Sequence, residues 1–248
     1  MEPLYDLRYE VVGHRRVTPV IVEVALRPRA APLRYTAGQY VLLSDGEGHL
    51  PQRSYSIANA PRPDGLITLL VTRVAGGALT TWLHERLRPG DEVALEGPYG
   101  TFVPVTERPL LLLAGGSGLA PMRAIAEASF AERPKRPITL FFSARTARDV
   151  IDRRLFSEWQ RGHEEFRYLL TLTREGGAPL RGRIPDLLEA AVGSTAEREV
   201  FIAGSEPFVA DCLQAARRLG AEGAQVRTEP FFCDPQPWLT LPGDQPGS

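Results

Sequence analysis

The residues most capable of chemistry stand together at Arg53 to Ser56, in the order Arg-Ser-Tyr-Ser. Their alternation is typical of a half-buried β-strand, but a strand that only fills a core needs no guanidinium beside a phenol ring. A guanidinium neutralises phosphate, a phenol ring stacks on a flat ring system, and a small hydroxyl hydrogen-bonds the edge of such a ring. An ordinary strand explains these four residues when they are taken alone, so the segments that accompany them decide the interpretation.

A glycine-rich turn at Gly115–Gly118 follows the apolar run Leu110–Ala114 and leads into a segment with helical periodicity. Glycines in such a turn let the backbone approach a ligand closely, and the free N–H groups at a helix start bind anions. Pro121 suits the first helical turn, where a missing N–H has no consequence. A simple turn is the alternative for this motif alone, but its place between a strand and a helix predicts a bound nucleotide.

A second glycine-rich turn, GGALTT at residues 76–81, also leads into a predicted helix. Alone it reads as the start of an amphipathic helix. Together with the other two segments it predicts a flavin, whose phosphates would lie at this turn. Arg53 would then neutralise phosphate, Tyr55 would lie against the isoalloxazine ring, and the Ser56 hydroxyl would reach the N5 edge of that ring.

The composition sets limits on the class of protein. The 248 residues are 43% hydrophobic and 24% charged, as in a soluble globular protein. A net charge of −1 gives no reason to expect nucleic acid or an anionic membrane as a partner. No apolar run is long enough to span a membrane. The two cysteines, Cys212 and Cys233, exclude an iron–sulfur centre held by four cysteines within this sequence and favour a cytoplasmic location.

The chain divides into two halves with different periodicity. Short strands punctuated by Gly, Pro and Asp precede the first boundary and predict an antiparallel β-barrel over residues 1–105. Apolar strands alternating with helices then predict an α/β Rossmann-like domain with a parallel sheet over residues 106–232. Residues 233–248 are rich in proline and glycine and form a predicted irregular tail.

The ends of two strands in the second half bear on the choice of nucleotide. An NAD site usually ends the second strand in Asp or Glu, which binds the ribose hydroxyls. Here Ser143 and Arg145 stand at that place, and Thr173 and Arg174 end the third strand. A hydroxyl and a cation suit a 2′-phosphate, so the sequence leans to NADPH over NADH. The evidence for NADPH is slight, because all but one of the 29 basic side chains are arginine, so an arginine at any one position carries little information.

These segments, in this order, resemble the ferredoxin–NADP reductase superfamily over nearly the whole chain. The flavin signature Arg-x-Tyr-Ser stands at Arg53–Ser56, and the second flavin-phosphate segment matches Gly76, Gly77 and Thr80. AGGSGLAP at residues 114–121 resembles the pyridine-nucleotide segment, and TEPF at residues 228–231 the end of the family's domain.

The resemblance implies a six-stranded barrel that holds FAD, favoured here over FMN, beside a domain that binds NADPH or NADH. Hydride would pass from the nicotinamide to flavin N5 and electrons onward to an acceptor. The residues implied at the reacting centre are Tyr55, Ser56, Ser117 and Glu229. The residues implied in cofactor binding are Arg53, Ser54, Tyr55, Ser56, Gly76, Gly77, Leu79, Thr80, Gly116, Ser117, Gly118, Pro121, Ser143, Arg145, Thr173, Arg174 and Phe231. No metal site is expected.

The acceptor is expected to be a separate ferredoxin, flavodoxin or oxygenase component, for which Arg27, Arg29 and Arg34 offer a docking patch or simply a solvated loop. One alternative is a reductase of free flavin, ferric chelates or quinones. Another is a flavin-bound electron-transfer or sensor subunit that does not oxidise NAD(P)H. Ala203 keeps this second alternative open, because it replaces the cysteine that the family usually has near the nicotinamide. Trp238 in the tail is a candidate to cover the flavin, and the oligomeric state is open.

Overall fold

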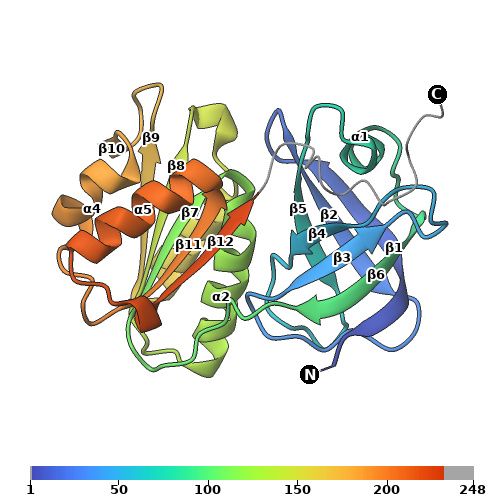
Figure 1. Ribbon diagram of the computed structural model, residues 1–248, viewed down its shortest axis with the longest axis horizontal. Helices are drawn as coiled ribbons and strands as arrows, with labels where there is room; N and C mark the ends of the chain where they lie inside the picture. The colour runs from blue at the N-terminus through green and yellow to red at the C-terminus, as the bar shows by residue number, and fades with distance from the viewer. Residues whose placement is uncertain (1, 232–248) are drawn as a thin grey trace, which may run out of the picture.

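The computed structural model describes residues 2–231, which form two six-stranded sheets lying side by side (Figure 1). The first sheet is antiparallel throughout, in the order β4-β3-β6-β1-β2-β5. Its strands are β1 (Leu4–Arg16), β2 (Ile21–Pro28), β3 (Tyr40–Ser44), β4 (Arg53–Ser56), β5 (Ile67–Thr72) and β6 (Glu92–Tyr99). A single bridge between Ile57 and Leu69 joins its two edges, so the sheet is a nearly closed barrel.

The barrel is filled by the alternate, inward-facing residues of its strands, as the period of two requires. Val22, Val24 and Leu26 of β2 are fully buried, and Val41 and Leu43 of β3 meet them in the same cluster. Helix α1 (Ala78–Glu85) packs on this cluster through Leu79 and Leu83. This packing holds the first turn of α1 against the end of the barrel.

The second sheet is parallel throughout, in the order β10-β9-β8-β7-β11-β12. Its strands are β7 (Leu110–Gly115), β8 (Ile138–Ala144), β9 (Phe166–Leu172), β10 (Leu180–Arg181), β11 (Glu199–Ser205) and β12 (Val226–Phe231). Its helices are α2 (Leu119–Glu132), α3 (Arg153–Gly162), α4 (Ile184–Val192) and α5 (Glu206–Arg218), and single 3₁₀ turns η1, η2 and η3 lie at Gly116–Gly118, Ala147–Asp149 and Gly223–Gln225.

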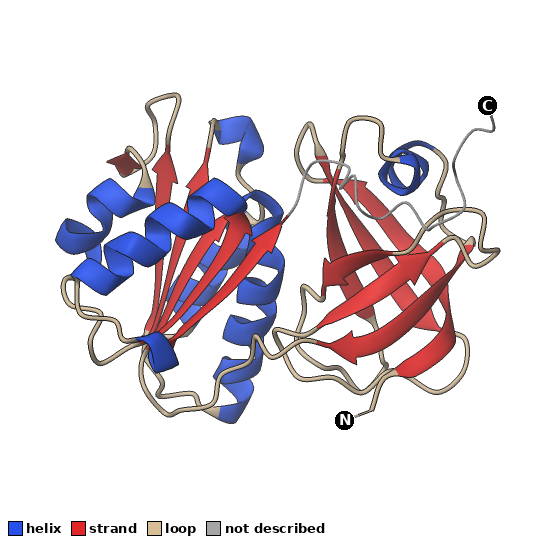
Figure 2. Cartoon of the chain, viewed as in Figure 1, coloured by secondary structure: helices blue, strands red, loops and turns tan. Residues whose placement is uncertain are grey.

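Helices cover both faces of the parallel sheet (Figure 2). Leu110 and Leu112 of β7 pack in the cluster with α2 and α3, whereas Leu111 and Leu113 pack in the cluster with α4 and α5. A strand buried on both faces reads as a continuous apolar run, which is why Leu110–Ala114 carries no polar residue. The predicted fold class, an antiparallel barrel followed by a Rossmann-like domain, is confirmed.

The chain leaves β7 in one direction along the sheet and returns to β11 on its other side. Ligands of open α/β sheets bind where the strand order reverses in this way, beyond the carboxyl ends of the strands. Here that place is the turn after β7, and α2, which starts there, lies on the side of the sheet nearest the barrel (Figure 1). Among residues 2–231, no helix is long and apolar enough to cross a membrane.

Candidate functional site

The barrel and the parallel sheet meet at four polar side chains, three of which were predicted from the sequence. The Ser56 hydroxyl of β4 donates to Glu229 Oε1 of β12 at 2.5 Å. The Thr72 hydroxyl at the end of β5 donates to Ser117 Oγ in the turn after β7 at 2.7 Å. Ser56, Ser117 and Glu229 are therefore brought to one junction, although 173 positions separate the first pair in sequence. Thr72 was not predicted, because nothing in its own strand marks it.

Glu229 is half-buried, and one of its two carboxyl oxygens is shielded from water. Burial raises its pKa to about 7, and the hydrogen bond from Ser56 opposes that rise. Its Oε2 is buried and has no hydrogen-bond partner among the described residues. A carboxyl with a pKa near neutrality can hold a proton or release it beside Ser56.

Tyr55 and Arg53 lie on β4 next to this junction. The Tyr55 hydroxyl is buried without a hydrogen-bond partner in residues 2–231, and burial raises its pKa against the charge of Arg53. Arg53 is exposed and donates to the neighbouring Gln52 carbonyl at 2.8 Å, and it forms no ion pair within the described part of the chain. Ser54 is exposed on the same strand. An exposed guanidinium without a carboxylate partner fits a flavin phosphate bound along β4, and Tyr55 beside it could lie against the flavin ring.

The turn at residues 76–80 leaves open space beside Gly76 and is closely packed at Leu79 and Thr80. Gly76 has φ +72°, and a Cβ there would meet nothing within 4 Å. The Thr80 hydroxyl turns inward, accepting from the Val74 N–H at 3.2 Å and donating to the Gly77 carbonyl at 3.1 Å, and Leu79 is buried in the barrel core. Leu79 and Thr80 therefore shape the turn with their side chains, and the open backbone beside Gly76 is what a phosphate would contact.

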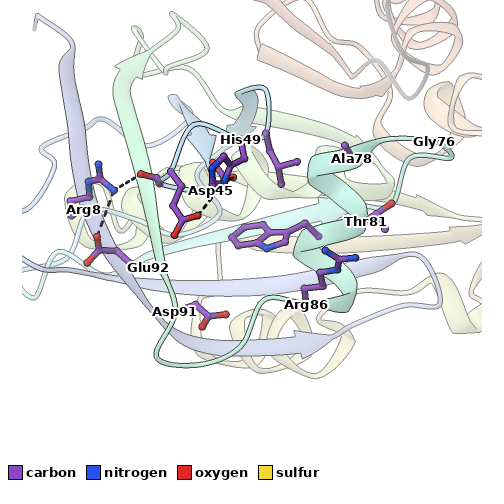
Figure 3. Close-up of a pocket in the computed structure, with 13 residues that line it drawn as sticks. Arg8, Asp45, His49, Gly76, Ala78, Thr81, Arg86, Asp91 and Glu92 are labelled. Atoms are coloured by element: carbon purple, nitrogen blue, oxygen red, sulfur yellow. Dashed lines mark hydrogen bonds and ion pairs between the residues drawn. The ribbon is translucent and has the colours of Figure 1, made fainter.

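A groove of about 890 Å³ continues from this turn along the barrel (Figure 3). One wall is the loop from Asp45 to Leu50, where Figure 3 shows His49, and the other wall is α1 with Thr81 and Trp82. The groove has the volume of a small-molecule site and could hold a nucleoside joined to phosphates at Gly76. Sequence analysis missed it, because its walls are segments far apart in the chain with no shared pattern.

The turn after β7 combines an open glycine with a tightly packed one. Gly116 has φ +56° and empty space where a Cβ would stand. A Cβ on Gly118 would lie 2.2 Å from the Ala203 carbonyl oxygen, so only glycine fits there. Pro121 is buried in the first turn of α2. The backbone at Gly116 is thus accessible to an anion, whereas Gly118 lets the helix start pack on β11, whose Ala203 is itself fully buried.

The predicted nucleotide-discriminating residues lie side by side at the carboxyl ends of β8 and β9. The Arg174 N–H donates to the Arg145 carbonyl at 2.9 Å, and the Thr173 N–H to the Ala144 carbonyl at 3.0 Å. Arg145, Thr173 and Arg174 are exposed, and Ser143 is half-buried. Glu175 brings a carboxylate to the same edge, where it accepts from the Ala147 N–H. The edge therefore presents two cations and one anion to a bound ribose.

The remaining candidates lie apart from the junction or take structural roles. Phe231 ends β12, pairs with Ser205 and packs partly on the core of the parallel sheet. Arg27 and Arg29 of the suggested docking patch are both paired with Glu10. In residues 2–231 no group of three or more His, Cys, Asp and Glu side chains could hold a metal ion. The tail, including Trp238, lies outside the described residues.

Comparison with known proteins agrees with this geometry. The family model described as "Oxidoreductase FAD-binding domain" matches residues 16–103, and "Oxidoreductase NAD-binding domain" matches residues 112–214. The chain is 31% identical to terephthalate 1,2-dioxygenase reductase component 1 of Comamonas sp, over 91% of this chain and 68% of that protein. It is 33% identical to ferredoxin–NADP reductase B of Sorangium cellulosum, over 89% of this chain and 96% of that protein.

Solved structures place the same fold on both halves. The chain superposes on a cytochrome P450 reductase of Amycolatopsis with a TM-score of 0.85 and 32% identity, over 91% of this chain and 69% of that one. It superposes on the ferredoxin reductase of a carbazole 1,9a-dioxygenase with a TM-score of 0.81 and 30% identity, over 94% of this chain and 70% of that one. The chain therefore belongs to the ferredoxin–NADP reductase superfamily and is an NAD(P)H-dependent FAD flavoprotein reductase.

Proposed function

We propose that this chain takes hydride from NAD(P)H where its two sheets meet and delivers electrons to a separate ferredoxin or oxygenase component. The observation that carries the proposal is the pair of contacts Ser56–Glu229 and Thr72–Ser117, which join the flavin strand β4 to β12 and the barrel strand β5 to the nucleotide turn by hydrogen bonds. The named activities of the relatives, reductase components of dioxygenases and ferredoxin reductases, support a protein as the acceptor.

In this proposal the barrel binds FAD along one continuous path. Arg53 and the open backbone at Gly76 hold the diphosphate, and the groove beside Trp82 takes the adenosine half. Tyr55 supplies an aromatic surface for the ring system. When bound, the flavin accepts hydride from the nicotinamide and releases electrons singly or as a pair.

The nucleotide domain orients the donor. Gly116 exposes backbone for the diphosphate of NAD(P)H, and Ser117, fixed by Thr72, stands beside the place for the nicotinamide. Arg145 and Arg174 favour NADPH over NADH, because their positive charges suit a 2′-phosphate. Ser56 and Glu229 hold a proton at the edge where the flavin N5 would lie, since the hydroxyl and the carboxyl share one hydrogen bond.

We also propose that the division into residues 1–105 and 106–232 marks two domains, with 233–248 as a tail. The two sheets and the segment between β6 and β7 support that division. A cytoplasmic location stays a prediction, resting on the two cysteines of the sequence.

The acceptor is tested by following NADPH and NADH oxidation with a [2Fe–2S] ferredoxin, free flavin, ferric citrate or a quinone as the only electron acceptor. We expect saturable reduction of the ferredoxin, with a higher kcat/KM than for any small molecule. Faster, saturable turnover of free flavin or the ferric chelate would instead make the chain a small-molecule reductase. Absence of nucleotide oxidation with every acceptor would favour an electron-transfer or sensor subunit.

A further inference from the structure

Helix α2 carries two charged side chains that reach the barrel. Arg123 Nε donates to the Ala58 carbonyl at 2.5 Å, and the Ala60 N–H donates to Glu127 Oε2 at 2.8 Å. The two side chains are four residues apart and therefore project from one face of the helix. They form hydrogen bonds with the backbone just after Ser56, the last residue of β4, which is the strand proposed to contact the flavin (the flavin strand).

Arg123 is the centre of a buried ion-pair network that spans both halves of the molecule. Its side chain is 7% exposed, and its Nη1 donates to Glu23 Oε2 of β2 at 2.8 Å and to Asp152 Oδ2 at 2.5 Å. Burial alone would raise the pKa of Glu23, but the charges and hydrogen bonds of Arg123 and Arg15 bring it below its usual value. Glu23 is thus ionised at neutral pH, and the ion pairs of Arg123 join β2 of the barrel to α2 and to Asp152, the residue before α3.

Residues 57–60, which Arg123 and Glu127 contact, are also hydrogen-bonded to the barrel, so they link the position of α2 to that of the barrel. Asn59 Oδ1 accepts from the Thr68 N–H at 2.6 Å, and Asn59 Nδ2 donates to the Leu66 carbonyl at 3.0 Å. The Ala58 N–H also donates to the Thr68 carbonyl at 2.8 Å. Residues 57–60 are therefore held against β5, and they follow the end of β4 directly along the chain.

The same helix begins at the nucleotide turn Gly116–Gly118. One helix thus starts at the nucleotide turn and, one to two turns later, contacts the segment that follows the flavin strand. We propose that Arg123 and Glu127 form an interdomain clamp that positions the flavin strand against the nucleotide turn, and so sets the distance over which hydride passes. They act as positioning residues, and this inference rests on the proposed function only where it concerns hydride.

Hydride transfer is sensitive to such a clamp because misplacement by about 1 Å can slow a reaction by about 100-fold. The test compares Glu127→Met, which removes the acceptor for the Ala60 N–H, with Glu127→Gln, which keeps an acceptor oxygen and restores the contact. Arg123→Met is the stronger perturbation, but it leaves Glu23 and Asp152 as buried unpaired carboxylates and can fail to fold. Arg154→Gln, on the exposed face of α3, serves as the surface control.

In anaerobic stopped-flow experiments with the FAD-loaded protein, Glu127→Met is expected to retain flavin and to bind oxidised nucleotide as the parent does. Its flavin reduction should be at least about tenfold slower, with a weaker charge-transfer absorbance, because only the relative placement of the two rings has changed. Glu127→Gln and Arg154→Gln should match the parent. Parental reduction and absorbance in Glu127→Met would overturn the clamp as a determinant of hydride distance.

A second readout does not depend on activity. Spin labels at Arg34→Cys in the barrel and Glu164→Cys in the nucleotide domain, both exposed, report the separation of the two halves in a Cys233→Ser background. Buried Cys212 stays unlabelled. The distance distribution should broaden in Glu127→Met and stay narrow in Glu127→Gln.

The two measurements separate failure of the clamp from failure of the proposed function. If the parent is not reduced by either nucleotide, the proposed function fails, and the label distances alone decide whether the clamp exists. If the parent is reduced but the variant's distance distribution is as narrow as the parent's, the clamp is wrong and the proposed function stands.

Discussion

Glutamine in place of Glu229 is expected to change how the stability of the protein depends on pH. The folded chain raises the pKa of this carboxyl from 4.5 to about 7 because the site excludes water. In the unfolded chain the group titrates near its usual value. Between those two pKa values the folded state binds more protons than the unfolded state, so the free energy of unfolding falls as pH rises.

The size of the effect follows from the shift. Each pKa unit corresponds to about 1.4 kcal/mol, so the parent loses about 3 kcal/mol from this group between about pH 4 and about pH 9. The contribution of this group to the free energy of unfolding is fully present below its pKa in the unfolded chain. It is lost as pH rises through its pKa in the folded chain. Glu229→Gln carries no charge at any pH and keeps an oxygen to accept from Ser56, so it removes this dependence and leaves every other titrating group in place.

The assay is urea unfolding of the flavin-free parent and variant at several pH values in that range. The difference between the two free energies of unfolding should move by about 3 kcal/mol in favour of the variant as pH rises, with most of the change below pH 7. A difference that does not vary with pH would refute the claim that Glu229 is buried with a raised pKa. A change of opposite sign would mean that the folded site stabilises the carboxylate.

Three further predictions concern the cofactor sites. Arg53→Ala should lose at least about 1.5 kcal/mol of flavin affinity, the range for a charge-assisted hydrogen bond, measured as FAD retained through gel filtration; a variant that elutes fully yellow would exclude the phosphate contact. Ser56→Ala should retain flavin but slow its reduction about 10-fold to 100-fold in stopped-flow traces, and parental traces would place the N5 contact elsewhere. Arg145→Glu and Arg174→Glu should each raise the KM for NADPH about tenfold or more, and that for NADH much less, because a carboxylate repels the 2′-phosphate. Equal effects on both nucleotides would remove the lean to NADPH.

The fold was predictable because each half has its own period. Alternation in β2 marks a barrel strand with one face in the core and the other face partly exposed, whereas Leu110–Ala114 is apolar throughout because β7 is covered on both faces. The division into an antiparallel and a parallel sheet therefore followed from sequence alone.

The site was predictable where a motif is contiguous, as at Arg53–Ser56 and Gly115–Gly118. The direction of a side chain within a motif was not predictable. Thr80 hydrogen-bonds within its own loop, and this orientation depends on the packing of α1 on the barrel. The groove beside Trp82 and the grip of Arg123 on Ala58 join positions far apart in the chain. The groove forms only when the barrel closes, and the Arg123 contact forms only when the two halves dock, so neither can be predicted from local spacing.

NAD(P)H is expected to reduce a flavin held at the junction of the two domains. Anaerobic stopped-flow reduction of the purified protein with NADPH and with NADH, followed by identification of the released flavin, measures this step. We predict rapid bleaching of the flavin absorbance and release of FAD. A flavin-loaded protein that neither nucleotide reduces would contradict the claim, and so would a colourless protein that cannot be reconstituted with FAD.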